Sequence, residues 1–207
     1  MAHIPDGVLS APVLMGGGAV AAALLTYSVR RLKEAQIPQA AVLSSAFFVA
    51  SLVHIPVGPT SVHPLLTGLL GVVLGWAAVP AVLVALLLQA VLFGFGGVTV
   101  LGVNVVNMAV PALVVAALFT PSIRSKTRPR SLFLLGLAAG ITGVGLVAIA
   151  VSTALALSSE AYVPALAVVF LSYGPLAIVE GVVTGAAVVL MRRVKPELLA
   201  SGVAISG

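Results

Sequence analysis

The amino end of the chain carries the clearest metal chemistry in this sequence. His3 follows Met1 and Ala2, so one α-amino group, one or two backbone amides and an imidazole lie within a few bonds of each other. Together they can surround a late first-row divalent cation with nitrogen ligands in linked five- and six-membered rings. Residues 4–7 (Ile-Pro-Asp-Gly) form a turn sequence, which would direct this segment rather than leave it loose.

His63 is the second candidate ligand. It lies in a loop expected over residues 54–64, which contains three prolines and should open on the same side of the molecule as His3. His54 begins that loop and is expected to support the site from the interface rather than bind the metal. The chain has no cysteine, so thiolate ligands are excluded and a metal site must use nitrogen or oxygen.

Several polar residues within apolar stretches need partners or a function, because polar groups are costly in hydrocarbon. Glu180 should lie near mid-depth, either hydrogen-bonded to Gln89 or to a Ser or Thr on another helix, or as part of a proton or cation pathway. Asn104 and Asn107 are expected to tie a glycine-rich loop over the outer cavity. The residues expected to support the ligands or to gate the site are Asp6, His54, Thr60, Ser61, Gln89, Asn104, Asn107 and Glu180.

Composition defines the class of protein. Of the 207 residues, 61% are hydrophobic and 7% are charged, whereas soluble domains carry roughly 25% charged residues. Mean hydropathy is +1.26, and several apolar runs are long enough to cross a bilayer. The ten basic residues form short clusters between these runs, which is a topology signal rather than a nucleic-acid site. A multi-pass membrane protein in a lipid bilayer, with no nucleic-acid partner, is therefore predicted.

The predicted fold is all-α, a single transmembrane domain over residues 1–207 with a metal-binding segment at 1–10. Pro80 is expected to split a long apolar run into two helices, because all ten Lys and Arg residues then fall on one side. The N-terminus would then lie outside and the C-terminus in the cytoplasm, with no cleavable signal peptide. The seven expected transmembrane helices cover residues 11–32, 38–53, 65–78, 80–94, 105–120, 131–157 and 162–191.

Three motifs in this order resemble the CbiM/NikM family: residues 3–7, residues 58–63 and residues 88–108. That family supplies the substrate-binding (S) component of energy-coupling-factor (ECF) transporters for cobalt and nickel. The resemblance implies a Ni²⁺ or Co²⁺ substrate held by the N-terminal amine, the backbone nitrogen and imidazole of His3, and a second imidazole from His63. It also implies a transmembrane coupling (T) subunit, cytoplasmic ATPases, a small membrane subunit and the plasma membrane of a prokaryote. The small residues of helix 11–32 would suit either close packing within the helix bundle or docking of the coupling subunit.

Ala2 departs from the family, whose members typically begin Met-His. If Met1 were removed, Ala2-His3 would restore the usual hook and His63 would be the fourth ligand. If Met1 is kept, Met1-Ala2-His3 offers four nitrogens and leaves His63 redundant or axial. The extra residue could also push the amine out of register and weaken the site.

Motifs that the sequence does not contain also limit the possible functions. The chain has no GxxxxGK[ST] motif, so another chain would have to hydrolyse ATP. A proton-coupled carrier or an intramembrane enzyme using Glu180 is the alternative, but paired carboxylates and a nucleophile–base arrangement are missing. An S component for an organic vitamin would need an aromatic-lined pocket, and only 5% of residues are aromatic. A metal-binding transport component without enzyme activity or organic cofactor is predicted.

Overall fold

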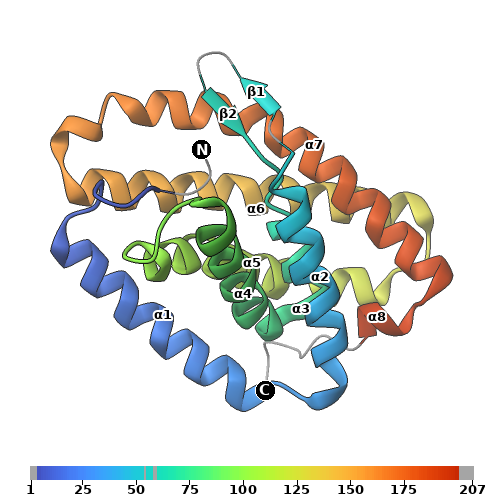
Figure 1. Ribbon diagram of the computed structural model, residues 1–207. Coiled ribbons are helices and arrows are strands. Elements are labelled where there is room, and N and C mark those ends of the chain that lie inside the picture. The colour runs from blue at the N-terminus through green and yellow to red at the C-terminus, as the bar shows by residue number, and fades with distance from the viewer. Residues whose placement is uncertain (1–3, 54, 58–59, 201–207) are drawn as a thin grey trace.

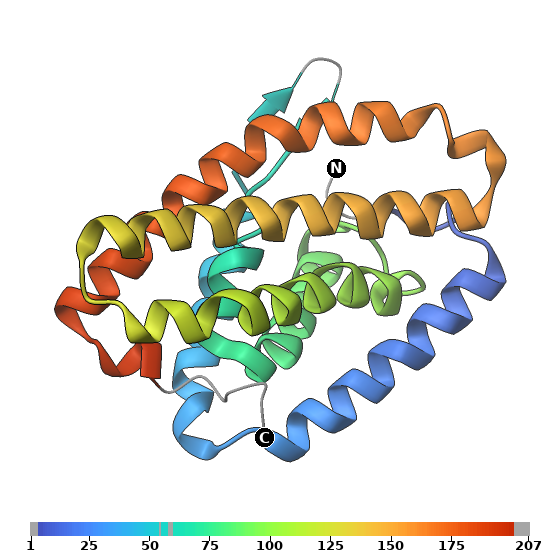
Figure 2. The same cartoon turned by 180° about the vertical axis from the view of Figure 1, so that it is seen from behind.

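The computed structural model describes residues 4–53, 55–57 and 60–200, and these form a helical protein with one small hairpin (Figure 1). The three longest helices, α5, α6 and α7, run side by side with α6 in the middle, as both views show (Figures 1 and 2). The predicted helical class is confirmed. The elements are α1 (Ala11–Arg31), η1 (Glu34–Gln36), α2 (Ile37–Ala50), β1 (Ile55–Val57), β2 (Thr60–Val62), α3 (Thr67–Leu74), η2 (Gly75–Ala77), α4 (Ala78–Phe93), α5 (Leu101–Ser125), α6 (Pro129–Ser158), η3 (Glu160–Tyr162), α7 (Ala165–Val194) and α8 (Glu197–Ala200).

Among the residues that the structure describes, five helical stretches are long and apolar enough to cross a membrane, which supports a multi-pass membrane protein. They comprise α1, the stretch Thr67–Phe93, α5, α6 and α7. Helix α2 has only 14 residues. The transmembrane count of seven and the orientation of the chain stay predictions.

The stretch Thr67–Phe93 consists of two helices, α3 and α4, as predicted, but the break lies elsewhere. Gly75 has a φ of 54°, a left-handed value that a glycine adopts without steric cost, and it starts the 3₁₀ turn η2. Pro80 lies in the first turn of α4, where a proline removes no helical hydrogen bond. The expectation that Pro80 breaks the run is therefore wrong, and Gly75 makes the break.

Contacts at the two ends of α3 and α4 show that the chain reverses between them. The Ser28 hydroxyl, near the end of α1, donates to the Trp76 carbonyl at 2.6 Å. At the other end of α4, the Phe93 ring lies 5.7 Å from the Phe48 ring, near the end of α2. Helices α1 and α2 run in opposite directions (Figure 1). Helix α3 therefore finishes at the end of the molecule where α1 finishes, and α4 runs back to the end where α2 finishes. The turn at residues 75–77 thus lies at the end of the molecule that carries the basic residues.

Two further boundaries differ from the expectations. Residues 55–57 and 60–62 form an antiparallel pair of strands within the stretch predicted as a loop. Helix α5 begins at Leu101 and continues through Pro121 to Ser125, so Asn104 lies inside a helix rather than in the preceding glycine-rich loop. Helix α5 therefore extends beyond the predicted 105–120 segment at both ends.

Glycines allow α3, α6 and α7 to pack backbone against backbone. A Cβ placed on Gly140 of α6 would lie 2.6 Å from the Glu180 carbonyl oxygen and 2.6 Å from Gly181 Cα. A Cβ on Gly68 of α3 would lie 2.6 Å from Gly140 Cα. Small residues at such crossings give close van der Waals contact, which is a main source of helix association in lipid. The start of α3 is therefore held against the middle of α6 and α7.

We expect Gly140→Leu to disrupt this crossing, because the side chain meets backbone atoms that cannot move aside. Overpacking of this kind destabilises by roughly 1–3 kcal/mol, so the melting temperature of the detergent-solubilised protein should fall. Gly145→Leu is the matched control, since a Cβ there meets nothing within 4 Å. Equal melting temperatures for the two variants would contradict the close crossing.

Candidate metal-binding site

Some of the predicted site residues lie within the described part of the chain, and others lie outside it. Met1, Ala2, His3 and His54 lie outside the described residues, as do the side chains of Thr60 and Ser61. The remaining candidates, which the structure describes, are Asp6, His63, Gln89, Asn104, Asn107 and Glu180. Among residues 4–53, 55–57 and 60–200, no three His, Cys, Asp or Glu side chains gather into a metal-binding group.

Ile4, the residue after His3, is fixed to α5 by a pair of hydrogen bonds. The Ile4 amide donates to Asn104 Oδ1 at 3.2 Å, and Asn104 Nδ2 donates to the Ile4 carbonyl at 3.1 Å. Ile4 is buried within the hydrophobic core and Asn104 is buried beside it. The side-chain amide thus pairs with both the N–H and the carbonyl of Ile4, as a neighbouring β-strand would. This pairing fixes the backbone of Ile4, the residue that follows His3.

Asp6 makes a second anchor on the glycine-rich loop before α5. Its backbone N–H donates to the Gly96 carbonyl at 3.1 Å, and its Oδ1 accepts from the Thr99 hydroxyl and from the Val100 amide. The Asp6 carboxyl occupies the space where a Cβ on Gly97 would lie, and Gly97 has a φ of 146°. Loop and N-terminal segment therefore fit each other, and a larger residue at 97 would separate them.

His63 lies immediately after β2 and is buried, with 4% of its surface exposed. Its Nδ1 lies 3.0 Å from the Pro64 carbonyl oxygen. Because a carbonyl can only accept a hydrogen bond, this contact requires the proton on Nδ1 and leaves the lone pair on Nε2. Neutral imidazole in this tautomer binds metals through Nε2, and the Nδ1 contact orients the ring.

Glu180 holds the segment that follows His63. Its Oε1 accepts hydrogen bonds from the amides of Leu65, at 2.6 Å, and Leu66, at 3.0 Å. Leu66 has a φ of 50°, the one described non-glycine residue with a left-handed backbone. That conformation costs about 1–2 kcal/mol, and two hydrogen bonds to a carboxyl group are of a size to offset it. The expected hydrogen bond from Glu180 to a side chain of another helix is replaced by this bond to backbone.

Glu180 lies at the middle of α7. The loop between His63 and α3, which Glu180 binds, is therefore held beside the middle of that helix. Gly140 and Gly143 of α6 pack on the start of α3 from the other side, because a Cβ on Gly143 would lie 2.9 Å from the Gly68 amide nitrogen. The loop after His63 therefore turns into α3 beside the centre of a 30-residue helix, not at its end.

Gln89 and Asn107 are buried amides near the end of the molecule that holds Ile4. Gln89 is fully buried one turn before the end of α4, and neither side-chain polar atom has a hydrogen bond within the described residues. Asn107 follows Asn104 by three residues, so the two lie on the same face of α5, and its Nδ2 likewise lacks a described partner. Unpaired buried amides are costly, so both side chains are candidates to support a bound ligand.

The structure thus links two parts of the predicted site to two different helices. Ile4 and Asp6 are fixed on α5 and its preceding loop, and the segment after His63 is fixed on α7. Sequence reasoning missed Thr99, Leu66 and Gly140, which respectively bind Asp6, present an amide to Glu180 and support α3. The only sequence signal for Thr99 was its place in the glycine-rich motif.

Comparison with known proteins connects this arrangement to a family. The family model described as the cobalt uptake substrate-specific transmembrane region, CbiM, matches residues 3–198. This protein belongs to the CbiM family. It is therefore a transmembrane component of cobalt or nickel uptake and a transporter component, not an enzyme. The match begins at His3 and includes both helices that hold the candidate site.

Relatives of the CbiM family resemble the chain over nearly its whole length. A protein of Haemophilus influenzae named for metal transport is 37% identical, with 95% of this chain and 96% of the relative covered. The fused nickel transport protein NikMN of Rhodobacter capsulatus is 36% identical over 96% of this chain, which spans 64% of that longer protein. The cobalt transport protein CbiM of Sorangium cellulosum is 32% identical, with coverage of 95% and 94%.

Solved structures show the same fold. A crystal structure of a transition metal transporter superposes with a TM-score of 0.79 at 28% identity, covering 93% of each chain. A truncated transition metal transporter gives a TM-score of 0.70 at 26% identity, covering 94% of this chain and 98% of the other. The fold of this CbiM family member is thus that of transition metal transporters.

Asn104→Ala should release the N-terminal segment from α5. The substitution removes both hydrogen bonds to Ile4, each contributing about 1 kcal/mol, so exchange of the amides in residues 4–7 should accelerate by about tenfold or more in hydrogen–deuterium exchange. Thr26→Ala is the control, because that hydroxyl bonds only within its own helix. Unchanged exchange in residues 4–7 of Asn104→Ala would refute the anchor.

Glu180→Ala should loosen the loop between His63 and α3. It leaves two buried amides without their acceptor, a loss of roughly 1–3 kcal/mol each, and hydrogen exchange over residues 65–70 should rise. Glu180→Gln keeps an acceptor oxygen and should largely restore protection, whereas the exposed Glu160→Ala should change nothing. Equal protection in the Ala and Gln variants would show that the hydrogen bonds to Glu180 do not hold the loop.

Proposed function

We propose that this protein is the substrate-binding membrane component of an ECF-type importer that captures Ni²⁺, or Co²⁺, at the end of the molecule where the N-terminal segment lies. The ligands are the Met1 amine, the backbone amide nitrogens of the Met1-Ala2-His3 segment and the His3 imidazole, with the imidazole of His63. The observation that carries the proposal is the double hydrogen bond between Ile4 and Asn104. It fixes the chain one residue beyond His3, as a chelating terminus requires.

The donor set favours a nitrogen-coordinated late transition metal. Deprotonated amides and imidazoles in one plane suit d⁸ Ni²⁺ better than Co²⁺, and the absence of cysteine removes thiolate competition. Amine, amide and imidazole must all lose protons to bind, so capture releases protons and weakens in acid. His63, with its proton on Nδ1, offers Nε2 as the metal-binding nitrogen.

The proposal gives the remaining tasks to other chains. Without a phosphate-binding GxxxxGK[ST] motif, transport depends on cytoplasmic ATPase subunits and on a transmembrane coupling subunit, with a small membrane subunit as a further partner. The assembly would lie in the plasma membrane of a prokaryote. Names of relatives that refer to nickel and cobalt transport support the substrate class.

Glu180 fits this proposal as a positioning residue. Its Oε1 already accepts two backbone amides, which is the role of a structural clamp rather than of a carrier group that exchanges protons. Its Oε2 is buried without a hydrogen bond in the described residues, which is the one observation on the side of the proton-coupled alternative.

Metal titration of the purified protein tests the proposal. Isothermal titration with Ni²⁺ and Co²⁺ should show tighter binding of Ni²⁺, and both His3→Ala and acetylation of the α-amine should weaken Ni²⁺ binding by roughly 100-fold or more, the loss of two or more ligand contacts. Mass spectrometry of the N-terminus establishes whether Met1 is present. Glu160→Ala, which changes an exposed residue outside the candidate site, is the control and should bind as the unaltered protein does.

His63→Ala separates the two ligand sets. A large loss of Ni²⁺ affinity would support three nitrogens from the terminus plus His63, and retained affinity would support four nitrogens from Met1-Ala2-His3. Unchanged Ni²⁺ affinity after acetylation would overturn the N-terminal chelate in both forms.

A further inference from the structure

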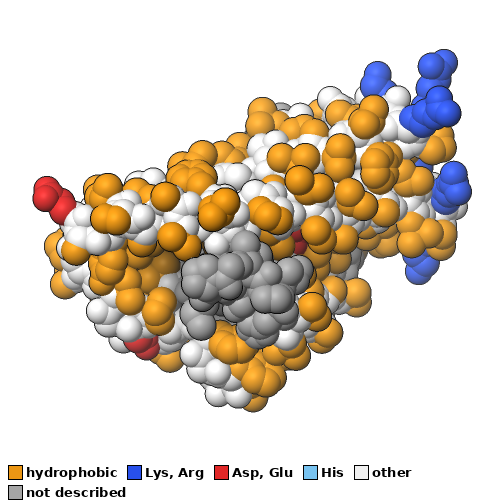
Figure 3. All heavy atoms as spheres, turned by 90° about the horizontal axis from the view of Figure 1, so that it is seen from above, with side chains coloured by type: hydrophobic (Ala, Val, Ile, Leu, Met, Phe, Trp, Pro, Cys, Tyr) orange, Lys and Arg blue, Asp and Glu red, His pale blue; other side chains and the backbone are white. Residues whose placement is uncertain are grey.

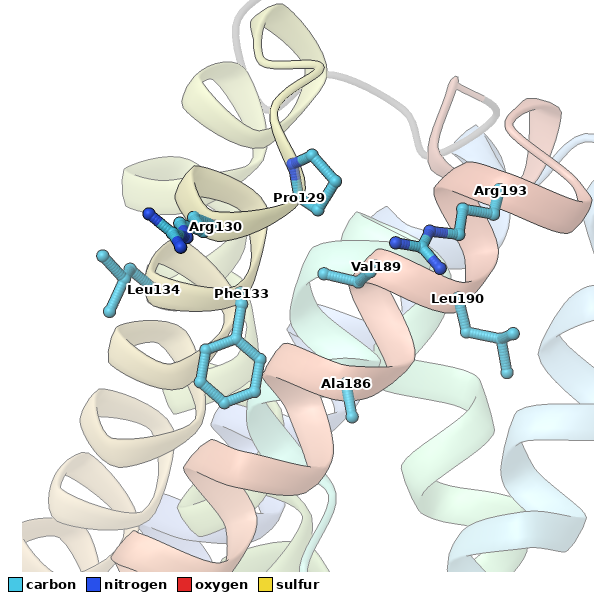
Figure 4. A pocket seen from close by; sticks show the side chains of 8 residues that line it. All are labelled: Pro129, Arg130, Phe133, Leu134, Ala186, Val189, Leu190 and Arg193. Atoms are coloured by element: carbon cyan, nitrogen blue, oxygen red, sulfur yellow. The ribbon is translucent and has the colours of Figure 1, made fainter.

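A groove lies between the start of α6 and the end of α7 (Figure 4). Ile4 is bonded to Asn104 near the start of α5, so the groove lies at the other end of the molecule. It is a shallow, largely open groove of about 620 Å³ between the first turns of α6 and the last turns of α7. The residues that line it are Pro129, Arg130, Phe133, Leu134, Ala186, Val189, Leu190 and Arg193. Six of these eight side chains are apolar, and two are arginines.

Local packing creates the floor of the groove. A Cβ on Gly185 would lie 2.7 Å from the Phe133 carbonyl oxygen and 3.0 Å from its ring, so Phe133 packs directly on the α7 backbone. Below it, Gly136 packs on Gly185 Cα at the same close range. The larger side chains begin beyond this crossing, where Ala186 and Val189 form one wall (Figure 4).

The two arginines of the groove are not engaged elsewhere in the described structure. Arg192, their neighbour, donates to the carbonyls of Ile123 and Arg124 at 2.7 and 3.1 Å and so ties α7 to α5. Within the described residues, neither Arg130 nor Arg193 has a hydrogen bond or ion pair, and no acidic residue lines the groove. Figure 3 shows visible Lys and Arg side chains gathered at one end of the molecule.

The position of the groove relative to a bilayer suits a lipid. Helices α6 and α7 each have 30 residues, about 45 Å at 1.5 Å per residue, whereas the hydrocarbon core is about 30 Å thick. Arg130 and Arg193 lie at the ends of these helices and would reach the headgroup layer. Leu134 and Leu190, 60% and 61% exposed, would face the acyl chains.

We propose that this groove binds an anionic phospholipid, whose phosphate lies beside Arg193, with Arg130 adding positive charge in the same headgroup layer, while an acyl chain lies along Phe133, Ala186 and Val189. A basic pocket between transmembrane helices at the membrane surface is suited to anionic headgroups. Guanidinium groups form paired hydrogen bonds with phosphate, and the apolar wall is complementary to a hydrocarbon chain rather than to a free ion. The binding site is independent of the metal site, which lies at the other end of the helices.

Native mass spectrometry of the detergent-purified full chain tests this site. With phosphatidylglycerol and phosphatidylcholine as probes, one phosphatidylglycerol molecule should bind roughly thirtyfold more tightly than phosphatidylcholine, as about 1 kcal/mol for each of the two arginines implies. The double variant Arg130→Gln/Arg193→Gln should lose that preference. The matched control Arg30→Gln/Lys33→Gln removes two charges near the end of α1 and should keep it.

Four results would overturn the lipid site. Equal binding of the two lipids by the unaltered protein would show that the anionic headgroup is not recognised. Equal loss of preference in the control variant would leave only general charge attraction. Displacement of phosphatidylglycerol by inorganic phosphate would identify a simple anion site. Unchanged lipid preference in the double variant, with failure to assemble with a coupling subunit, would assign the groove to a protein partner. Ni²⁺ affinity should be unchanged in both variants, which shows that they fold.

Discussion

The structure depends on hydrogen bonds to buried backbone amides at a point where the chain is not helical and lies beside apolar helices. The chain leaves β2, passes His63 and enters α3 next to the middle of α7, where water is not available to free N–H groups. Glu180 resolves this by accepting the amides of Leu65 and Leu66 with one oxygen. The start of α3, which follows this loop, packs closely on α6 at Gly68 and Gly140. One buried carboxyl thus makes the non-helical entry to α3 compatible with an apolar surrounding.

Much of this arrangement follows from sequence, because hydrophobic length and the positions of basic residues constrain helices strongly. The helical class, the division of residues 67–93 into two helices and the burial of Glu180 were all predictable. The break lies at Gly75 and not at the expected Pro80, because a proline is tolerated in the first turn of a helix. The strand pair around residues 55–62 was hidden by its prolines and glycine, which are equally typical of a loop.

The partners of the candidate site were less predictable than its members. The sequence predicts Asp6 and Asn104 as residues that support the site. Their contacts, however, join residues about a hundred positions apart in the chain. Composition and periodicity contain no information about such pairs, whereas the family motifs contain both ends. Glu180 was expected to bond a side chain. Its bond to backbone depends on Leu66 adopting a left-handed conformation, which a leucine in an apolar run does not indicate.

The two parts of the candidate site belong to two helices that are joined at their far ends. Asn104 fixes the N-terminal segment to the start of α5, and Glu180 fixes the loop after His63 to α7. Arg192 of α7 binds the carbonyls of Ile123 and Arg124 at the end of α5. Because each half of the site follows its own helix, any tilt of α7 against α5 about this junction changes the separation of the N-terminal segment from the His63 loop.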